Sequence, residues 1–179
     1  MRILVTGAAG FIASHLCEKL ADLGHEVLGV DNFNDYYNPE LKKLNANDLA
    51  KKGIKIFTVD LNADLSKVFE KPYDYIYHLA AQPGISSNTS LEEYVNNNIY
   101  ATQNLLDAVL NYNSNLKSFI NISTSSVYGI EATVNEEVPP RPVSFYGSTK
   151  LAAEQLVLGL QRLGRLNACS IRLYSVYGP

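Results

Sequence analysis

Tyr146 and Lys150 stand four positions apart, a spacing that suits proton transfer. Residues four apart on a helix share one face and lie one turn from each other. A lysine ammonium beside a phenol favours phenolate, which lowers the tyrosine pKa from about 10 toward neutral pH. Such a tyrosine can act as a general base toward a substrate hydroxyl.

The position of this pair is more informative than its spacing. A chain rich in tyrosine forms such pairs by chance, and a lysine stem packed over an aromatic ring explains many of them. Here the pair opens a predicted helix at 144–163, downstream of the hydroxyl-rich residues 123–126 that end a predicted strand. This placement favours catalysis, with packing as the alternative.

The elements that must position these side chains begin at the N-terminus. A predicted strand at 2–6 runs into residues 7–13, Gly-Ala-Ala-Gly-Phe-Ile-Ala, a G-x-x-G-x-x-A turn. In the dinucleotide fingerprint, glycines such as Gly7 and Gly10 let a pyrophosphate approach the N-terminus of a helix. The helix that follows carries Ile12, Leu16, Leu20 and Leu23 at helical spacing, which predicts its buried face, and the next residue is a glycine that predicts its end.

An acidic residue completes the fingerprint. Asp31 lies 21 residues beyond Gly10, at the end of the predicted strand 26–30. A carboxylate there can accept hydrogen bonds from the hydroxyls of an adenosine ribose. It would repel the 2′-phosphate of NADP, and neither Asn32 nor Phe33 supplies a cation, so the sequence predicts NAD as the cofactor.

Composition restricts the class of protein. The chain has 179 residues, 46% of them hydrophobic and 18% charged, with a net charge of −3. This length predicts one domain, and the acidic balance disfavours nucleic acid as a partner. No apolar run suits a membrane span or signal peptide, so we expect a cytoplasmic protein. Cys17 and Cys169 lack the spacing of a metal site or disulfide framework, and we expect both to be core thiols.

Strands alternate with helices along the rest of the chain. Further strands are predicted at 54–59, 75–79, 119–122 and 168–173, and further helices at 40–52 and 90–112. This alternation predicts an α/β fold of the Rossmann type, a doubly wound parallel sheet with helices on both faces and strand order 3-2-1-4-5-6.

Ligands of such a sheet lie beyond the carboxyl ends of its strands. Asp60 follows the third strand and either contacts an adenine amino group or caps a helix; the two interpretations are equally supported. Ala80 and Ala81 follow the fourth strand and are expected to wall a cofactor groove. Asn98 falls on the core-facing stripe of the helix at 90–112, with Leu91, Val95, Thr102, Leu105 and Val109. Its buried amide either bonds a neighbouring backbone or supports the site.

Together these residues resemble the extended short-chain dehydrogenase/reductase family, and within it the NAD-dependent nucleotide-sugar epimerases and dehydratases. The resemblance spans the chain and is carried by residues 6–13, 78–81, 127–129 and 172–179, with Asn98, Thr124, Tyr146 and Lys150. The loop at 31–37, Asp-Asn-Phe-Asn-Asp-Tyr-Tyr, looks most like that of UDP-glucuronate 4-epimerases.

The resemblance implies roles for individual residues. Thr124, Tyr146 and Lys150 match the catalytic triad, and Asn98 matches a supporting asparagine. Asp31 and Asp60 match ribose and adenine contacts. The implied NAD contacts are Gly7, Gly10, Phe11, Ile12, Asp31, Asn32, Asp60, Leu61, Leu79, Ala80, Ala81, Asn98, Tyr146, Lys150 and Tyr174. The implied substrate is a UDP-sugar, and a homodimer is compatible with the family.

Two features refine the expected reaction. Ser125 and Ser126 stand where related dehydratases and decarboxylases resemble Asp-Glu or Ser-Glu, so 4-epimerisation is favoured over 4,6-dehydration. Family members usually continue well past the equivalent of residue 179 into a region that holds the nucleotide of the substrate. The chain is therefore expected to be the NAD-binding part of an epimerase, with a non-catalytic NAD-binding module as the alternative.

Overall fold

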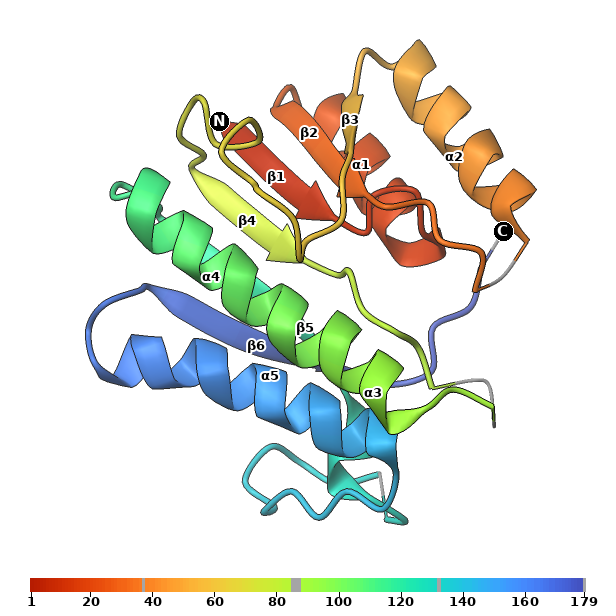
Figure 1. Ribbon diagram of the computed structural model, residues 1–179, viewed down its shortest axis with the longest axis vertical. Coiled ribbons are helices and arrows are strands. Elements are labelled where there is room, and N and C mark those ends of the chain that lie inside the picture. The colour runs from red at the N-terminus through yellow and green to blue at the C-terminus, as the bar shows by residue number, and fades with distance from the viewer. Residues whose placement is uncertain (37, 85–87, 132, 179) are drawn as a thin grey trace.

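The chain forms a single six-stranded parallel sheet covered by helices (Figure 1). The computed structural model describes residues 1–36, 38–84, 88–131 and 133–178; Tyr37 and Pro179, which the family resemblance includes, lie outside them. The strand order is β3-β2-β1-β4-β5-β6, and every neighbouring pair is parallel. The predicted fold and strand order are confirmed. The strands are β1 (Arg2–Thr6), β2 (Glu26–Asp31), β3 (Lys55–Thr58), β4 (Tyr75–His78), β5 (Ser118–Thr124) and β6 (Ala168–Leu173).

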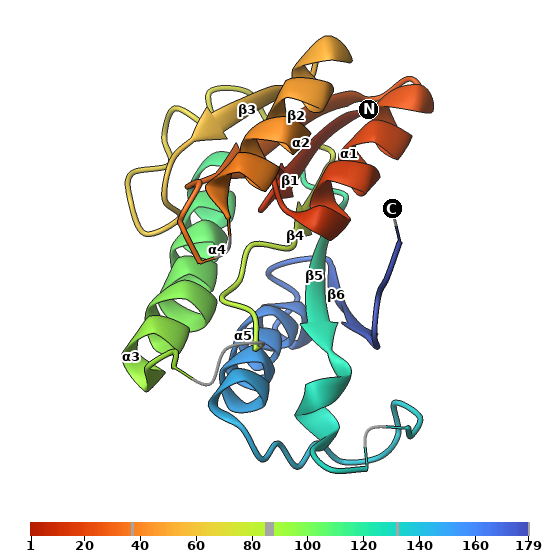
Figure 2. The ribbon, with the colours of Figure 1, turned by 90° about the vertical axis from the view of Figure 1, so that its right-hand side faces the viewer.

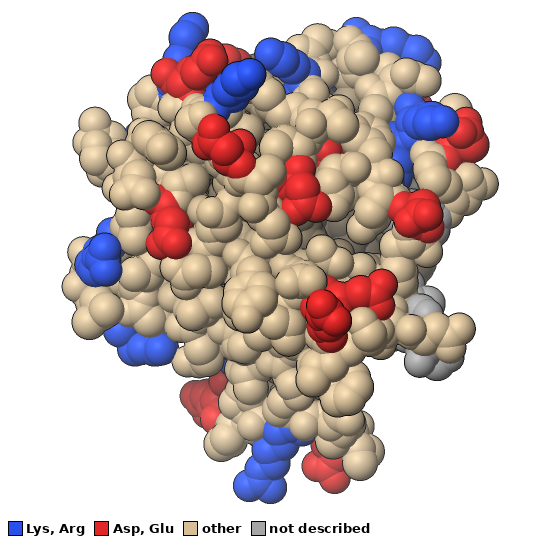
Figure 3. Space-filling view, in the orientation of Figure 1, with Lys and Arg blue, Asp and Glu red and all other residues tan. Residues whose placement is uncertain are grey.

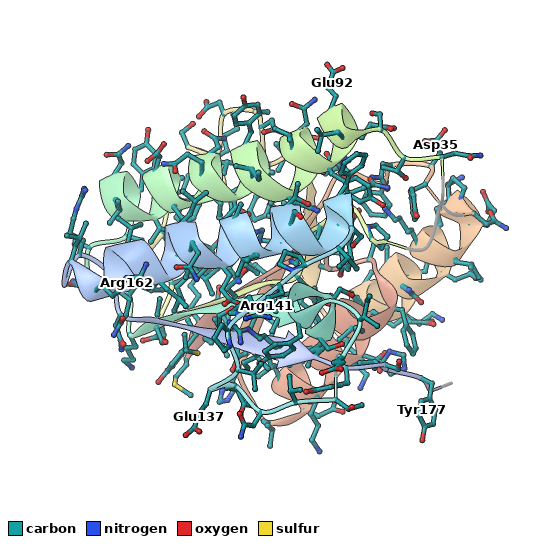
Figure 4. The ribbon with its side chains drawn as sticks, turned by 90° about the horizontal axis from the view of Figure 1, so that it is seen from below. Asp35, Glu92, Glu137, Arg141, Arg162 and Tyr177 are labelled. Atoms are coloured by element: carbon teal, nitrogen blue, oxygen red, sulfur yellow. The ribbon has the colours of Figure 1, made fainter. Side chains whose placement is uncertain are left out.

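The helices cover the sheet from both sides (Figure 2). On one face, α1 and α2 pack against β1 and β2 around Ile3, Val5 and Val27. On the other face, α4 and α5 lie side by side (Figure 4) and pack over Leu4, Ile76 and neighbouring apolar residues. The helical elements are α1 (Phe11–Asp22), α2 (Pro39–Lys51), α3 (Leu91–Tyr94), the π-helix η1 (Val95–Tyr100), α4 (Ala101–Tyr112), the 3₁₀-helix η2 (Ser125–Tyr128) and α5 (Phe145–Arg162).

The buried face of α1 differs from the one predicted. Its buried residues are Ala13, Ser14, Cys17 and Leu20, whereas Ile12 and Leu23 are 38% and 61% exposed. Small residues at 13, 14 and 17 let the helix lie close to the strands. Of the predicted face, Leu20 is buried and Leu16 is partly buried against the core, so the prediction is wrong only for Ile12 and Leu23. Ile12 borders the cavity described below.

The two cysteines also differ from each other. Cys17 is buried on the sheet-facing side of α1 as expected. Cys169 is exposed, so the prediction that Cys169 is a core thiol is wrong. Cys169 lies on β6, one of the two edge strands of the sheet. Ser170 and Arg172 face α5, and because side chains alternate along a strand, Cys169 points to the opposite face.

The helix predicted at 90–112 contains a π-helical segment. Ser90 and Glu93 form a capping box at its start, and η1 occupies residues 95–100. The wider π turn adds a residue to the helical repeat and rotates the preceding face. As a result Tyr94 is buried, whereas Leu91, predicted on the buried stripe, is 48% exposed.

The surface shows no strong segregation of charge in the view of Figure 3, where basic and acidic side chains are interspersed. None of the helices in the described residues has the length and apolar character that crossing a membrane requires.

Candidate functional site

A cavity of about 700 Å³ lies at the carboxyl ends of the strands. Doubly wound sheets bind ligands at this edge, where the strand order reverses between β1 and β4. The cavity is bordered by nearly all of the predicted site residues: Gly7, Gly10, Phe11, Ile12, Asp31, Asn32, Asp60, Leu61, Leu79, Ala80, Ala81, Thr124, Tyr146, Lys150 and Tyr174. Asn98 is buried behind its wall.

The turn between β1 and α1 requires glycine at its first position. Gly7 has φ +70°, and a Cβ there would lie 3.0 Å from the Cα and nitrogen of Ala80. The backbone of the loop after β4 thus passes directly beside this turn. The helix α1 begins after Gly10 without a side-chain cap and without an acidic residue in its first turn, so its N-terminal amides face the cavity edge uncapped by its own side chains.

Asp31 is almost fully buried and held by three donors. Its Oδ2 accepts a hydrogen bond from the Ala9 amide at 3.1 Å, and its Oδ1 accepts one from the Phe33 amide at 2.8 Å. The third donor is Lys42, whose Nζ lies 3.4 Å from Oδ1. Lys42 also donates to Asn34 Oδ1 at 2.7 Å. Lys42 stands on α2 with no local motif around it, so no pattern in the sequence pointed to it.

Asp60 does not cap a helix. A turn follows it, and its carboxylate accepts hydrogen bonds from Asn32 Nδ2 and the Asn62 amide, both at 2.8 Å. Burial acts to raise the pKa of Asp60, but these hydrogen bonds hold it below its ordinary value. The structure therefore excludes the interpretation of Asp60 as a helix cap. The carboxylate is a charged group at the border of the cavity.

Tyr146 and Lys150 lie on α5 at the other end of the cavity, beside Thr124 at the end of β5. Burial raises the pKa of Tyr146, although a hydrogen bond with Thr124 acts to lower it. Lys150 is buried and donates from Nζ to the Ile122 carbonyl at 2.6 Å, and burial lowers its pKa to about 8. Burial thus outweighs the Thr124 hydrogen bond at Tyr146, and the lowering expected from Lys150 together with a nicotinamide cation stays a prediction for the cofactor-bound site.

Asn98 joins the loop after β4 to α5. Its Oδ1 accepts a hydrogen bond from the Gln82 amide at 2.7 Å, and its Nδ2 donates to Thr149 Oγ1 at 3.1 Å. Further along this loop, a Cβ at Gly84 would lie 2.6 Å from the ring of Tyr146. The loop therefore packs against the tyrosine, and Asn98 holds one end of it.

A buried histidine continues this network to β1. His78 Nε2 lies 2.9 Å from Thr102 Oγ1, which itself donates to the Asn98 carbonyl at 2.7 Å. Because Thr102 donates its hydroxyl proton to the Asn98 carbonyl, it can only accept from His78, so Nε2 carries the histidine proton. The unprotonated Nδ1 then accepts a hydrogen bond from Thr6 Oγ1 at 2.8 Å. Burial lowers the pKa of His78 to about 3, so the ring is neutral, and its two hydrogen bonds link Thr102 on α4 to Thr6 on β1.

A buried ion pair lies behind Lys150. Glu154, one turn later on α5, is 1% exposed and accepts from Arg172 Nη2 at 2.5 Å and Nε at 3.1 Å. Arg172 Nη1 donates to the Tyr128 hydroxyl at 2.7 Å. The pair ties β6 and η2 to the helix that carries Tyr146. No sequence signal pointed to Glu154, beyond its place on the same helical face as Lys150.

Removing the negative partner of this pair should destabilise the chain in a pH-dependent way. Burial acts to raise the pKa of Glu154. The hydrogen bonds and charge of Arg172 nevertheless hold this pKa below its ordinary value of 4.5. A depressed pKa stabilises the fold above the unfolded pKa, and this stabilisation is lost as pH falls through the folded pKa. We expect Glu154→Gln to cost about 3 kcal/mol at pH 7.

The measurement is urea unfolding of both proteins at pH 7, 5 and 3.5. The difference in unfolding free energy between them should shrink as pH falls below the ordinary carboxyl pKa of 4.5, because the unfolded wild-type chain then binds the Glu154 proton more readily than the folded chain does. Glu137→Gln, at an exposed position, is the matched control and should leave stability unchanged. A difference in unfolding free energy that stays constant with pH would contradict the assignment of Glu154 as the ionised partner of Arg172.

Comparison with known proteins places this site in a wider context. The model of the NAD dependent epimerase/dehydratase family matches residues 3–179. UDP-glucuronate 4-epimerase 3 of Arabidopsis thaliana is 37% identical over 184 residues, covering 99% of this chain and 43% of that protein. The crystal structure of UDP-glucuronic acid 4-epimerase from Bacillus cereus, in complex with UDP-glucuronic acid and NAD, is 41% identical with a TM-score of 0.90. It covers 100% of this chain and 58% of that chain. The chain thus spans about half the length of these relatives.

Proposed function

We propose, since the chain belongs to the NAD dependent epimerase/dehydratase family, that it forms the NAD-binding and catalytic part of a UDP-sugar 4-epimerase. The observation that carries the proposal is the single cavity that has the Gly7 turn and Asp31 at one end and Thr124, Tyr146 and Lys150 at the other. A dinucleotide would thereby bring its reactive ring to the hydroxyl groups of the site.

The residues present fit a dinucleotide. The close approach of Gly7 to Ala80 leaves no room for a side chain, and the uncapped start of α1 suits a pyrophosphate. Asp31 and Asp60 offer acceptors to ribose and adenine. When bound, NAD would take a hydride from the substrate carbon and return it.

The remaining chemistry belongs to the side chains. Tyr146 would take the proton from the 4-hydroxyl of the sugar and give it back after hydride returns. Thr124 would hydrogen-bond the same oxygen and so orient it. Lys150, protonated below its pKa of about 8, would hold the nicotinamide ribose and favour phenolate.

The absence of acids beside Thr124 favours epimerisation. Among the described residues, the carboxylates that border the cavity are Asp31 and Asp60, at the ends of β2 and β3. Ser125 and Ser126 follow Thr124 in η2, and neither can assist elimination of water or loss of carbon dioxide as a carboxylate would. A transient 4-keto sugar would then be reduced from its other face, which inverts C4 without net redox change.

The product of UDP-glucuronate tests the reaction. In the protein extended to the length of its relatives, we expect the C4 epimer, identified by NMR, with no accumulation of reduced cofactor. UDP-glucose should be tested in parallel, because the substrate assignment follows the relatives and the loop at 31–37. A 4-keto-6-deoxy sugar or a pentose as the main product would refute 4-epimerisation.

Cofactor choice provides a second test. Asp31 repels a 2′-phosphate and accepts from ribose hydroxyls, so the 179-residue chain should bind NAD more tightly than NADP. A hydrogen bond to a charged group contributes roughly 1.5–3 kcal/mol, so Asp31→Ala should weaken NAD binding about tenfold or more. Titration calorimetry measures both the NAD and NADP affinities and the effect of Asp31→Ala. Equal affinities of the wild-type chain for the two cofactors would contradict the role assigned to Asp31. The homodimer and the cytoplasmic location stay predictions.

A further inference from the structure

We propose that Gly84 is a positioning residue for Tyr146: the loop after β4 contacts the tyrosine ring at this glycine and thereby fixes the direction of the phenol hydroxyl. The proposal rests on the proposed function, in which that hydroxyl moves the proton. A Cβ at Gly84 would lie 2.6 Å from Cδ1, 2.7 Å from Cγ and 3.0 Å from Cβ of Tyr146. Non-bonded carbon atoms pack at about 3.5–4.0 Å. The ring in its present position therefore leaves no space for a side chain at Gly84.

The need for glycine at this position comes from the contact and not from the backbone angle. The φ of Gly84 lies outside the left-handed region, unlike the φ of Gly7 or Gly129. The three atoms nearest to a Cβ at Gly84 all belong to Tyr146. The ring of the tyrosine is thus the feature that restricts this position.

Side chains of η1 hold the loop in place. Asn98 Oδ1 accepts a hydrogen bond from the Gln82 amide at 2.7 Å, and Asn97 Nδ2 donates to Gln82 Oε1 at 3.2 Å. Neighbouring residues of a π-helix are separated by a smaller rotation than those of an α-helix, which lets both asparagines face one glutamine. Gln82 is 4% exposed, so the loop is anchored two residues before Gly84.

A tyrosine of α3 anchors the next residue of the loop. Tyr94 is buried, and its hydroxyl donates to the Pro83 carbonyl at 3.4 Å. The ring centroids of Tyr94 and Tyr146 lie 6.2 Å apart, and the two rings are tilted by 49°. Gly84 itself is exposed to solvent, so the anchors at residues 82 and 83 are what keep its backbone against Tyr146.

The backbone that carries Tyr146 is also confined. A Cβ at Gly147 would lie 2.5 Å from the Ser126 carbonyl oxygen, so the first turn of α5 lies directly against η2. With its backbone held, Tyr146 can move only by rotating its side chain, and Gly84 restricts that rotation. The hydroxyl is thereby kept beside Thr124, with which it forms a hydrogen bond.

Gly84→Ala is expected to lower kcat for UDP-glucuronate about a hundredfold in the protein extended to the length of its relatives. The added methyl group must displace the ring by about 1 Å, and a misplacement of that size costs about 10²-fold. NAD binding by the 179-residue chain should stay within about threefold of wild type, because the Gly7 turn and Asp31 are unchanged. Gly159→Ala is the matched control: it makes the same substitution on α5, where the nearest atom would lie 3.9 Å from the Cβ, and should leave kcat unchanged.

A double variant tests whether Gly84 acts through the tyrosine hydroxyl. In the Tyr146→Phe background, Gly84→Ala should lower the residual kcat by less than about twofold, because the group that it misplaces is absent. A general distortion of the fold or of the substrate site would instead lower kcat by the same factor in both backgrounds. Equal factors would overturn the proposal.

NMR of the 179-residue chain, with labelled tyrosine, tests the position of the ring without turnover. Nuclear Overhauser effects between the Tyr146 ring and the Thr124 side chain should be strong in the wild type and in Gly159→Ala, and weaker in Gly84→Ala. If the extended wild type forms no C4 epimer, the proposed function falls, while these spectra still decide the role of Gly84. Unchanged Overhauser effects in Gly84→Ala would overturn that role.

Should Gly84→Ala fail to fold, Asn97→Ala decides. This variant removes one hydrogen bond to Gln82 and so loosens the loop, which should weaken the same Overhauser effects and lower kcat about threefold. Asn96→Ala, at an exposed position of the same helix, should change neither. Equal behaviour of the two asparagine variants would overturn the proposal.

Discussion

Replacing Tyr146 by phenylalanine is expected to lower kcat for UDP-glucuronate by about 10²–10⁴ in the protein extended to the length of its relatives. The change removes one hydroxyl and leaves the ring that packs against Gly84 and faces Tyr94 at 6.2 Å. Binding of NAD by the 179-residue chain should stay within about threefold of wild type, because the main cofactor contacts lie elsewhere.

The control for this variant is Tyr94→Phe. Tyr94 lies beside Tyr146, and its hydroxyl donates to the Pro83 carbonyl at 3.4 Å. Losing that weak contact should affect kcat only slightly. Burial raises the pKa of Tyr146, so activity of the wild type should increase with pH as phenolate forms. More than a tenth of wild-type activity in Tyr146→Phe would exclude this residue as the general base.

Replacing Lys150 by methionine is expected to stabilise the fold while damaging the site. Burial lowers the pKa of Lys150 from 10.5 to about 8, so the buried charge opposes folding at pH 7. Each pKa unit corresponds to about 1.4 kcal/mol, which sets an upper limit near 3 kcal/mol. The lost hydrogen bond to the Ile122 carbonyl offsets about 1 kcal/mol of it. A net gain of about 2 kcal/mol remains.

The pH dependence identifies the cause. Between pH 8 and 10.5 the unfolded chain holds the Lys150 proton more tightly than the folded chain, so wild-type stability gains from this group as pH rises. Lys150→Met lacks that gain, and the two proteins should converge toward pH 10.5 in urea unfolding. Calorimetry should show weaker NAD binding by the variant. A variant less stable than wild type at pH 7 would contradict the account of Lys150 burial.

The glycine turn, the alternation of strands and helices, and the acid after β2 are all local patterns in the sequence. These patterns were sufficient to predict the strand order and to identify residues, from Gly7 to Tyr174, that border one cavity. Hydrophobic spacing was less reliable for burial. It placed Ile12 and Leu23 in the core of α1, although α1 packs through Ala13 and Cys17. Size alone does not show which face approaches a sheet most closely.

The sequence by itself determined the fold class, the family and the chemical types in the site, because these depend on short-range spacing and on which residues end each strand. Tertiary structure alone decided that Lys42 reaches Asp31, that Arg172 pairs with Glu154, and that burial raises the Tyr146 pKa. Each of these depends on packing between elements distant in the chain. Desolvation and ion pairing arise only when such elements enclose a charge, so no local pattern encodes them.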